Sequence, residues 1–251
     1  MNEPVGEKEM GELVSVIIPF YNCSYVHQAI ESALAQTYSP VEVIVVNDGS
    51  IKEVERVTPY LPYIHYIEKE NGGTASALNA GIRAASGSYF CWLSSDDVFL
   101  PGKVDTQLTE MKRIGANFSF TAFDTMDATG QTIDANVELV ERTVLDLYRR
   151  MSKGCPINGC TVLCEMDLFY RMGVFDESFR FTQDYELWLR FLPSIRVHYV
   201  RQPLTRYRVH TEMGTKQFPT AIRKEIRQVR ERYSEQMGEL IREERLKNSQ
   251  L

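Results

Sequence analysis

Apolar residues in the N-terminal part of the chain come in short continuous runs that alternate with segments of helical periodicity. Residues 14–18 predict a buried strand, which Pro19 stops, and residues 41–46 predict a second strand. Between them a helix is expected from about Ser24, because apolar residues recur there at helical spacing. The remaining elements of this part are a weaker strand at 63–67, a helix at 74–85 and a strand at 89–93. Strands that alternate with helices predict an α/β fold with a mostly parallel, doubly wound sheet.

The second half of the chain has a less regular pattern. Its predicted elements are strands at 118–123, 160–163, 196–200 and 204–209, a hairpin turn at 127–130, and helices at 165–172 and 184–191. Residues 221–246 predict one amphipathic helix, because a single apolar line crosses a highly charged segment. That line consists of Ile222, Ile226, Val229, Tyr233, Met237 and Leu240. The helix either packs back on the domain or forms a homodimer with a second copy, and the periodicity alone leaves both open.

Composition and charge narrow the class of protein. The chain has 251 residues, enough to bury a full core, and its 43% hydrophobic content is that of an ordinary globular domain. A net charge of -6 argues against nonspecific nucleic-acid binding. The five cysteines do not suggest a disulfide framework, and no histidine lies near Cys155, Cys160 and Cys164 to complete a zinc site. Without a long apolar stretch or a signal-like N-terminus, a cytoplasmic location is expected.

Two short acidic elements stand at the ends of predicted buried strands. Asp48, in the sequence Asn-Asp-Gly-Ser, follows the second strand, and the pair Asp96-Asp97 follows the strand at 89–93. The carboxyl edge of an open α/β sheet is where ligands bind. Carboxylates gathered there need a cation or hydrogen-bond donors, and oxygen ligands suit magnesium or manganese. A single such aspartate more often caps a helix or starts a turn, but two in one half of the chain favour a site.

The residues around these elements also limit how a nucleotide would be held. Tyr21 lies just after the first strand, so an aromatic ring and the carboxylate of Asp48 are expected at neighbouring strand ends. Such a pair can sandwich a nucleobase and accept its hydrogen bonds. Neither a G-x-G-x-x-G fingerprint nor a Walker A loop follows the first strand. Phosphates would therefore be held in another way, and a divalent cation at Asp96 is the natural candidate.

A series of short motifs gives the chain a specific resemblance. In order, they are Pro19-Phe20-Tyr21-Asn22, Gln36-Thr37-Tyr38, Asn47-Asp48-Gly49-Ser50, Asn71-Gly72-Gly73, Leu78-Asn79-Ala80-Gly81, Ser95-Asp96-Asp97, Gly173-Val174-Phe175-Asp176, Asp184-Tyr185-Glu186-Leu187-Trp188 and Tyr207-Arg208-Val209-His210. Because of these motifs, the chain resembles a family 2 glycosyltransferase with the GT-A fold. The resemblance implies a polar lead at 1–12, a glycosyltransferase domain at 13–215 and a C-terminal charged helix at 216–251. Within the domain, 13–100 would form the nucleotide-sugar half and 101–215 the acceptor half.

The resemblance assigns roles on the donor side. Pro19 and Tyr21 match the loop that holds the base, and Asp48 matches the carboxylate that reads the base or ribose. Asp96 matches the metal-binding acid of the D-x-D motif, although Ser94 stands where the first aspartate often lies. His210 matches a histidine that can complete the metal shell; otherwise it is a loop histidine that only donates a hydrogen bond. Gly73 precedes the helix at 74–85, so backbone donors there either approach the donor sugar or phosphate or form a simple turn. Asn79 and Ser95 are further residues expected on the nucleotide side.

On the acceptor side, the resemblance makes Asp184 the catalytic base, with Gln183 in place of the usual glutamate. A helix N-cap is the plainer interpretation of Asp184. Candidates for the acceptor cleft are Asn158, Gly159, Trp188 and Arg190, of which Trp188 fits the core better because apolar residues flank it.

These assignments predict an inverting, metal-dependent glycosyltransferase. It would use Mn²⁺ or Mg²⁺ and a nucleotide-sugar donor, expected to be a UDP-sugar, and its acceptor would be a glycan or a lipid-linked saccharide of surface polysaccharide synthesis. A lipid-linked acceptor would bring peripheral membrane association, although the mixed charges of the C-terminal helix argue against strong attraction to anionic lipid. The alternative is a sugar-nucleotide-binding protein that has lost catalysis, which Ser94 alone favours. A nucleotidyltransferase would need a Gly-rich basic loop in place of residues 19–22.

Overall fold

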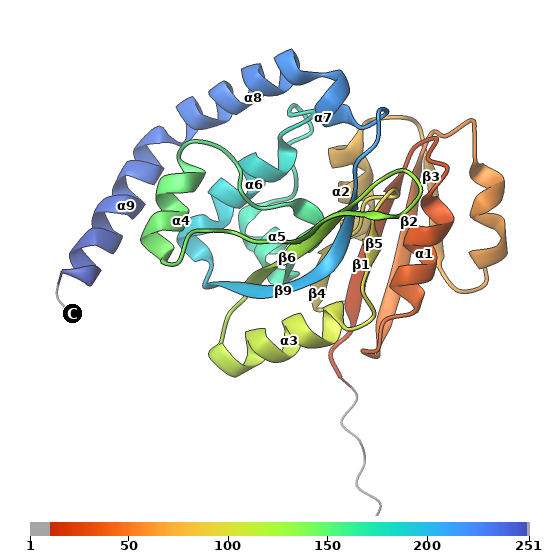
Figure 1. Cartoon of the computed structure of the whole chain (residues 1–251), viewed down its shortest axis with the longest axis horizontal. Coiled ribbons are helices and arrows are strands. Elements are labelled where there is room, and N and C mark those ends of the chain that lie inside the picture. Colours follow the sequence, from red (N-terminus) through yellow and green to blue (C-terminus); the bar gives the residue numbers. More distant parts are fainter. Residues whose placement is uncertain (1–10, 250–251) are drawn as a thin grey trace, which may run out of the picture.

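The computed structural model describes residues 11–249, and its centre is a nine-stranded mixed sheet (Figure 1). The strand order is β3-β2-β1-β4-β8-β6-β9-β5, and β7 pairs with β6 beside this path. The strands are β1 (Val14–Phe20), β2 (Val41–Asp48), β3 (His65–Lys69), β4 (Tyr89–Trp92), β5 (Val98–Phe99), β6 (Phe118–Met126), β7 (Thr132–Val137), β8 (Leu163–Glu165) and β9 (Val197–Arg208).

Helices cover both faces of this sheet. The α-helices are α1 (Val26–Leu34), α2 (Thr74–Ala84), α3 (Lys103–Ile114), α4 (Val144–Met151), α5 (Asp167–Met172), α6 (Gln183–Phe191), α7 (Gly214–Gln217), α8 (Pro219–Arg232) and α9 (Ser234–Asn248). Single 3₁₀ turns are η1 (Val54–Arg56), η2 (Thr58–Tyr60), η3 (Gly159–Thr161) and η4 (Leu192–Ser194). The predicted α/β fold with a mostly parallel sheet is confirmed.

The strands β1 to β4 are parallel to one another. β1 lies between β2 and β4, and β3 extends the sheet beyond β2. β8 then runs antiparallel between β4 and β6, and β6 pairs in parallel with β9. As a consequence, β6 runs in the same direction as β4, and the carboxyl ends of β1, β2, β4 and β6 all point to one edge of the sheet.

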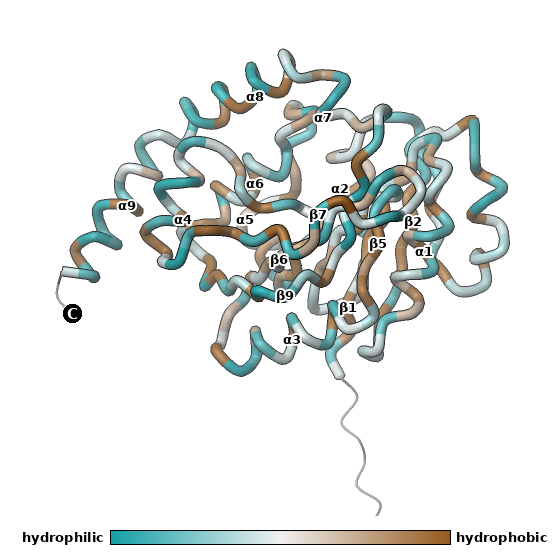
Figure 2. The backbone as a smooth tube through the Cα atoms, in the orientation of Figure 1, coloured by the Kyte–Doolittle hydropathy of each residue, from teal (hydrophilic) through white to brown (hydrophobic). Residues whose placement is uncertain are grey.

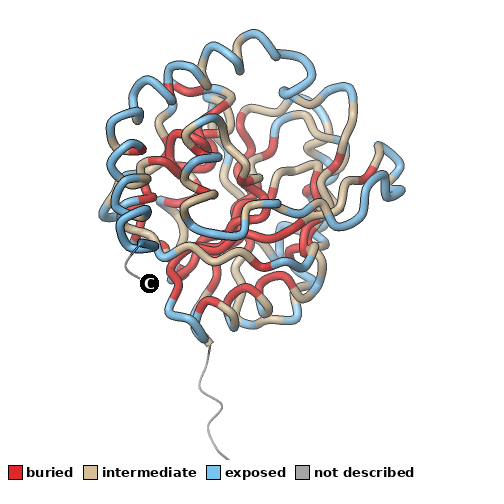
Figure 3. The backbone as a smooth tube through the Cα atoms, turned by 60° about the vertical axis from the view of Figure 1, so that its left-hand side comes forward, coloured by how far each residue is buried: buried red, intermediate tan, exposed pale blue. Residues whose placement is uncertain are grey.

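Alternate residues of the central strands point into two separate cores. In β1, Val16 and Ile18 pack with α1 and α3, whereas Ile17 packs on the other face with α2 and α6. This period of two is what a sheet covered on both faces requires. The brown central strands of Figure 2 and the red interior of Figure 3 show the same arrangement: apolar strands inside, with polar, exposed helices outside.

The C-terminal segment differs from its prediction as one helix. It forms two helices, α8 and α9, with a break at Tyr233, whose φ of -106° and ψ of 11° are not helical. Val229 and Met237 on either side of the break are fully buried in the core that contains α6. The helices arch around α6 and α4 (Figure 1), so the apolar line packs against the chain's own domain. A homodimer through this segment stays a prediction.

Other boundaries also differ from expectation. The strands expected at 196–200 and 204–209 are one long strand, β9, and the strand expected at 160–163 is the turn η3 followed by β8. The elements β5, β7, α3, α4 and α7 were not predicted. The polar lead at 1–12 lies almost entirely outside the described residues. In residues 11–249, none of the helices combines the length and apolarity that crossing a bilayer requires.

Candidate active site

Asp48 ends β2 at the carboxyl edge of the sheet, where it holds the turn that leads into α2. Its buried carboxylate accepts hydrogen bonds from Lys69 Nζ at 2.7 Å, Gly72 N at 3.0 Å and Gly73 N at 2.7 Å. Lys69 ends the neighbouring strand β3 and lies beside Asp48 in the register. Gly73 has a φ of +86°, a conformation that glycine adopts without strain. Lys69 was not expected from the sequence, since a single lysine in a polar segment gives no signal.

The loop after β1 stands next to this turn. Pro19 lies within β1, paired with Val46, and Tyr21 follows the strand with 54% of its surface exposed. The side chain of Asn22 ties the loop down, because its Oδ1 accepts hydrogen bonds from the backbone of residues 51 and 52, both at 2.9 Å. The Tyr21 ring is therefore free to contact a ligand, while the backbone beneath it is fixed.

Asp96 and His210 meet although they are 114 residues apart in the sequence. Asp96 Oδ2 lies 2.9 Å from His210 Nε2, and about a quarter of the Asp96 side chain is exposed. Asp96 follows β4, and His210 follows β9. The His210 ring also packs against Tyr25, with ring centroids 5.7 Å apart. The two residues thus form one polar pair that opens to solvent at the carboxyl edge.

Arg208 is buried beside the Asp96–His210 pair and contacts the backbone of Asp96. Its side chain is 1% exposed and donates hydrogen bonds to the backbone oxygen of Asp96 and to Gln28 Oε1, both at 2.7 Å. Longer bonds reach the backbone oxygens of residues 127 and 128 in the turn after β6. The guanidinium lies 4.1 Å from the centre of the Tyr25 ring, within cation–π range. Arg208 therefore fixes the backbone that carries Asp96.

Asp97 has a different environment from Asp96. It is fully buried, and its Oδ1 accepts a hydrogen bond from Arg208 N at 2.7 Å. Its Oδ2 has no hydrogen-bond partner within residues 11–249, although the Cys160 thiol lies nearby. Burial, with Asp96 adding to it, raises the pKa of Asp97 well above its ordinary value. Ser94, at the position of the first acid of the D-x-D motif, has its hydroxyl 3.0 Å from Cys160 Sγ.

Asp184 is the second residue of α6, and Thr182 occupies the N-cap position. The N-cap interpretation is therefore wrong. The Asp184 carboxylate accepts one hydrogen bond, from Tyr185 N at 2.7 Å, and no ion pair to it occurs among residues 11–249. Burial raises its pKa from 3.8 to about 6. A carboxylate with little compensation for its charge is more basic than an ordinary aspartate.

Two of the expected site residues have structural contacts instead. The buried amide of Asn79 spans from α2 to the loop before α6: Nδ2 donates to Phe175 O at 2.9 Å, and Oδ1 accepts from Phe175 N at 3.0 Å. With Glu177 as a further partner of Nδ2, no free group of Asn79 is left for a nucleotide. Ser95 stays beside Asp96, where its backbone oxygen accepts a hydrogen bond from the Cys23 thiol.

Most of the acceptor-side candidates also have structural contacts. Trp188 is fully buried against Phe118 and other aromatic rings, so it belongs to the core. Gly159 is buried against the Trp92 ring, which would lie only 2.2 Å from an added Cβ.

Arg190 likewise serves the fold. Its guanidinium donates to the backbone oxygens of residues 172 and 174 and pairs with the buried Glu186 at 2.8 Å. Trp188 and Arg190 are therefore engaged in the fold, and Gly159 packs against Trp92. None of the three lines the pocket that contains Asn158.

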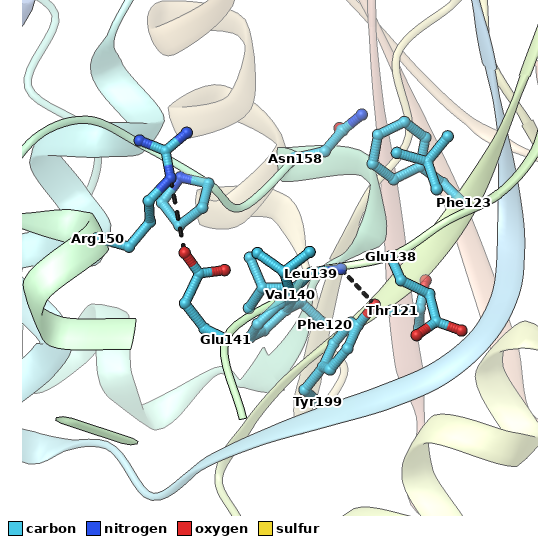
Figure 4. Close-up of a pocket in the computed structure, with 12 residues that line it drawn as sticks. Phe120, Thr121, Phe123, Glu138, Leu139, Val140, Glu141, Arg150, Asn158 and Tyr199 are labelled. Carbon is cyan, nitrogen blue, oxygen red and sulfur yellow. Dashed lines mark hydrogen bonds and ion pairs between the residues drawn. The ribbon is translucent and has the colours of Figure 1, made fainter. Parts of the chain in front are cut away.

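Asn158 lines a pocket of about 240 Å³ (Figure 4). Its Oδ1 caps the turn η3, and two residues later Cys160 contacts Ser94. Figure 4 shows Asn158 and Phe123 on one side of the pocket and Arg150 with Glu141 on the other. The remaining lining residues are Phe120, Thr121, Val137, Glu138, Leu139, Val140, Pro156 and Tyr199. Pro156 follows Cys155, a thiol whose pKa is raised well above its ordinary value by burial, with the charge of Asp184 adding to the shift.

The Asp96–His210 pair is suited to a divalent cation that a substrate helps to hold. A carboxylate oxygen and an imidazole nitrogen 2.9 Å apart can face a single ion. No group of three or more His, Cys, Asp or Glu side chains in the described part of the chain could form a complete site. Magnesium at phosphate-transfer sites is commonly held in this incomplete way, by one or two carboxylates with substrate phosphates and water. The residues present fit such an ion.

Comparisons with known proteins agree on one family. Residues 15–179 match the profile described as Glycosyl transferase family 2. The chain is 38% identical over 221 residues to the uncharacterized glycosyltransferase RP339 of Rickettsia prowazekii, a match that covers 81% of this chain and 66% of that protein. A related Rickettsia felis protein is matched over only 35% of its length. The chain therefore spans from about a third to about two thirds of these relatives.

Two further comparisons come from proteins with more specific names. The UDP-Glc:alpha-D-GlcNAc-diphosphoundecaprenol beta-1,3-glucosyltransferase WfaP of Escherichia coli is 29% identical over 206 residues, which is 79% of this chain and 78% of WfaP. The crystal structure of S. aureus TarS 1-349 in complex with UDP-GlcNAc superposes with a TM-score of 0.65 at 18% identity, covering 78% of this chain and 58% of that one. The profile match, the relatives and the shared architecture show that the chain belongs to glycosyltransferase family 2 and has the GT-A fold.

Proposed function

We propose that this protein transfers a sugar from a UDP-sugar to an acceptor hydroxyl, with inversion at the anomeric carbon. The observation that carries the proposal is the meeting of Asp96 and His210 at the carboxyl edge of the sheet, from segments 114 residues apart. The choice of UDP rests on relatives, since the name of WfaP specifies UDP-Glc and TarS structures contain UDP and UDP-GlcNAc.

The donor would lie along the edge formed by β1, β2 and β4. The exposed Tyr21 ring offers a face on which a base can stack. Asp48 and Lys69 stand at the adjacent strand ends as one acceptor and one donor for polar groups of the nucleoside. Asp96 and His210 would hold Mn²⁺ or Mg²⁺ together with the diphosphate. When bound, the cation stabilises the negative charge that develops on the departing diphosphate.

Asp184 would act as the base. Its pKa of about 6 leaves it mostly ionised at neutral pH, yet more basic than an ordinary aspartate. As the bond from the acceptor oxygen to the anomeric carbon forms, Asp184 takes the hydroxyl proton and the bond to the diphosphate oxygen breaks. Attack from the side opposite the leaving group inverts the configuration in a single displacement, so no covalent sugar–enzyme intermediate is needed.

The Asn158 pocket would receive the acceptor sugar. At about 240 Å³ it is smaller than the range of ~300–1,000 Å³ typical for drug-sized ligands, a size that suits one sugar ring. Its apolar side chains can face the ring, while the Asn158 amide and the Glu141 carboxylate can bond hydroxyl groups. Asn158 precedes Cys160, which contacts Ser94, by two residues, and this contact supports placing the acceptor beside the D-x-D position.

Calorimetric titration with UDP-, GDP- and dTDP-sugars, with and without manganese, tests the donor assignment. Manganese-dependent binding of UDP-sugars is expected, with loss in Asp96→Ala and retention in Asp184→Asn. Asp105→Ala, which changes an exposed carboxylate on α3, serves as the matched control. Absence of binding to every nucleotide sugar, with or without metal, would overturn the proposal.

The loss-of-catalysis alternative rests on Ser94, whose hydroxyl contacts Cys160. It predicts metal-dependent donor binding without transfer or donor hydrolysis. The raised pKa of Asp184 opposes it, because a binding protein has no need for a carboxyl group that burial destabilises. Donor hydrolysis by the wild type that disappears in Asp184→Asn would exclude this alternative.

A further inference from the structure

The loop that leads into α6 is held by a carboxylate from a later helix. Glu225 lies on α8, and its side chain is half-buried against this loop. Its Oε1 accepts a hydrogen bond from Arg180 N at 3.1 Å, and its Oε2 accepts one from Phe181 N at 2.9 Å. Oε2 also accepts from the backbone N and from the hydroxyl of Thr182, each at 3.0 Å. Four hydrogen bonds from three successive residues therefore converge on one side chain.

These bonds replace a local cap at the start of α6. Thr182 occupies the N-cap position, but its side chain makes no capping bond to the helix. Its hydroxyl and its backbone N–H both bond to Glu225 instead. Hydrogen bonds to an ionised carboxylate are stronger than those between neutral groups. Glu225 therefore fixes the point from which α6 begins.

Two further contacts hold the same loop to α8. Arg232 pairs with Asp176 at 2.9 Å, and its guanidinium lies 4.7 Å from the centre of the Phe179 ring. Phe218, which directly precedes α8, stacks on Phe181, with ring centroids 5.0 Å apart and an angle of 28° between the rings. The loop is therefore fixed to α8 by side chains near both of its ends.

Asp184, the proposed base, follows the last of the Glu225 bonds by two residues. Its carboxylate accepts one hydrogen bond, from the backbone N of the next residue, Tyr185. That bond sets the carboxylate relative to α6, but it does not set α6 relative to the rest of the site. The start of the helix is set at Thr182, and hence by Glu225. A shift of about 1 Å at a reacting group can lower a rate by about a hundredfold.

We propose that Glu225 is a positioning residue for Asp184. By holding the backbone of residues 180–182, it would keep the Asp184 carboxylate within reach of the acceptor hydroxyl. Glu225 would act only through this backbone, so it neither takes the proton nor touches the substrate. The inference rests on the proposed role of Asp184 as the base. Since the bonds of Glu225 go to residues 180–182 and not to the donor edge, its loss should lower kcat and leave the donor Kd unchanged.

Manganese-dependent hydrolysis of UDP-glucose and UDP-GlcNAc measures kcat, with water in place of the acceptor. Glu225→Ala should lower kcat by about ten- to a hundredfold. Glu225→Gln keeps one oxygen that can accept hydrogen bonds from Phe181 and Thr182, so its kcat should lie between those of Glu225→Ala and the wild type. Glu231→Ala, which changes an exposed carboxylate on the same helix, is the control of equal charge change and should keep the wild-type kcat.

A ¹³C NMR titration of the Asp184 carboxyl gives a second measurement, which needs no activity. The signal is assigned by its absence in Asp184→Asn. Glu225→Ala removes a negative charge, leaves N–H groups before α6 unpaired and admits water, and each change favours the ionised form of Asp184. The pKa of Asp184 should therefore fall from about 6 toward 3.8. The Cys155 thiol stays neutral over this range, because burial raises its pKa, with the charge of Asp184 adding to the shift.

Val229→Ala separates positioning from stability. Val229 is fully buried on α8, so its truncation weakens the packing of that helix without removing the bonds to residues 180–182. Thermal unfolding should show a lower Tm, while kcat and the pKa of Asp184 stay at their wild-type values. Equal losses of kcat in Val229→Ala and Glu225→Ala would overturn the inference, and so would a wild-type kcat and pKa in Glu225→Ala. Should Glu225→Ala not fold, the smaller changes in Glu225→Gln decide the same question.

The two measurements also separate this inference from the proposed function. A wild type that neither binds nor hydrolyses any nucleotide sugar would remove the transferase proposal, and the NMR titration would still decide whether Glu225 positions the Asp184 carboxyl. Normal donor affinity and hydrolysis, with no effect of Glu225 on kcat or on the pKa of Asp184, would remove only the inference.

Discussion

Replacing Arg208 by methionine would remove a buried guanidinium while keeping most of the apolar volume of the side chain. The two hydrogen bonds at 2.7 Å, to Asp96 O and Gln28 Oε1, would be lost together with the contact to the Tyr25 ring. A hydrogen bond that involves a charged group contributes about 1.5–3 kcal/mol, and the buried acceptors would be left unpaired. We expect the free energy of unfolding to fall by about 3–5 kcal/mol, a large part of the total for a typical domain.

Urea denaturation followed by circular dichroism measures this loss as a shift of the midpoint at unchanged slope. The control is Arg201→Met, which removes an exposed ion pair to Glu138 at 3.0 Å. That change should cost less than about 1 kcal/mol. If Arg208→Met costs no more than Arg201→Met, then the contacts of Arg208 with Asp96, Gln28 and Tyr25 do not stabilise the fold, and the reasoning fails.

The same variant should also affect the donor site. Arg208 holds the backbone of Asp96 and precedes His210 by two residues, so its loss would loosen both proposed metal ligands. Manganese-dependent UDP-sugar binding should weaken in Arg208→Met. Arg208→Lys should not restore it, since an ammonium cannot reproduce the fork of bonds to Asp96 and Gln28. Full donor affinity in Arg208→Met would show that Asp96 and His210 are positioned without the hydrogen bonds of Arg208.

Three further predictions concern other parts of the site. The transfer rate should rise with pH through about 6, following ionisation of Asp184. The folded pKa of that carboxyl, about 6, is above its ordinary value of 3.8, so the contribution of Asp184 to folding stability should fall as pH rises from 3.8 to about 6. Asp184→Asn should therefore stabilise the fold at pH 7 but not at pH 4, as thermal unfolding would show. Gly159→Ala, whose new Cβ would meet the Trp92 ring at 2.2 Å, should cost about 1–3 kcal/mol in calorimetric unfolding, whereas Gly154→Ala has open space and should cost little. Val140→Glu, at an exposed rim of the Asn158 pocket, should raise the acceptor KM and leave the donor Kd unchanged.

The N-terminal half of the fold could be predicted from the sequence because its strands are buried on both faces. Residues 14–18 and 41–46 are continuous apolar runs, and the structure extends each by only two residues, to Phe20 and Asp48. The second half depends on pairings that no local pattern encodes. The parallel register of β6 with β9, in which Phe118 meets Val197, joins segments far apart in the chain.

The break between α8 and α9 at Tyr233 was also not predictable from the sequence pattern. Val229 and Met237 keep the same helical spacing across Tyr233, so the apolar line looks continuous in the sequence. In the structure, the Tyr233 hydroxyl donates to the buried Glu186, and the chain turns there onto α4. Periodicity reports which residues face inward and does not report where a helix changes direction.

For the candidate site, the sequence predicted the strand ends but not the residues that support them. Asp48 and Asp96 lie at the carboxyl edge as expected, and His210 meets Asp96 there. Arg208 was missed as a supporting residue, because an arginine that is 1% exposed contradicts the usual preference of that side chain for the surface. The sequence offered one signal for it, a position two residues before His210 in the last motif of the series.

The distance in sequence between Asp96 and His210 has a consequence for how the protein folds. A contact across 114 residues closes a very long loop, and such contacts form late and slowly. The β1–β4 half could reach native pairing early in folding and still lack His210, one of the two proposed cation ligands. If the pair holds the cation as proposed, metal-dependent donor binding should become measurable only when β9 has joined the sheet. In a refolding experiment it should then appear with the last step of folding rather than with the first collapse.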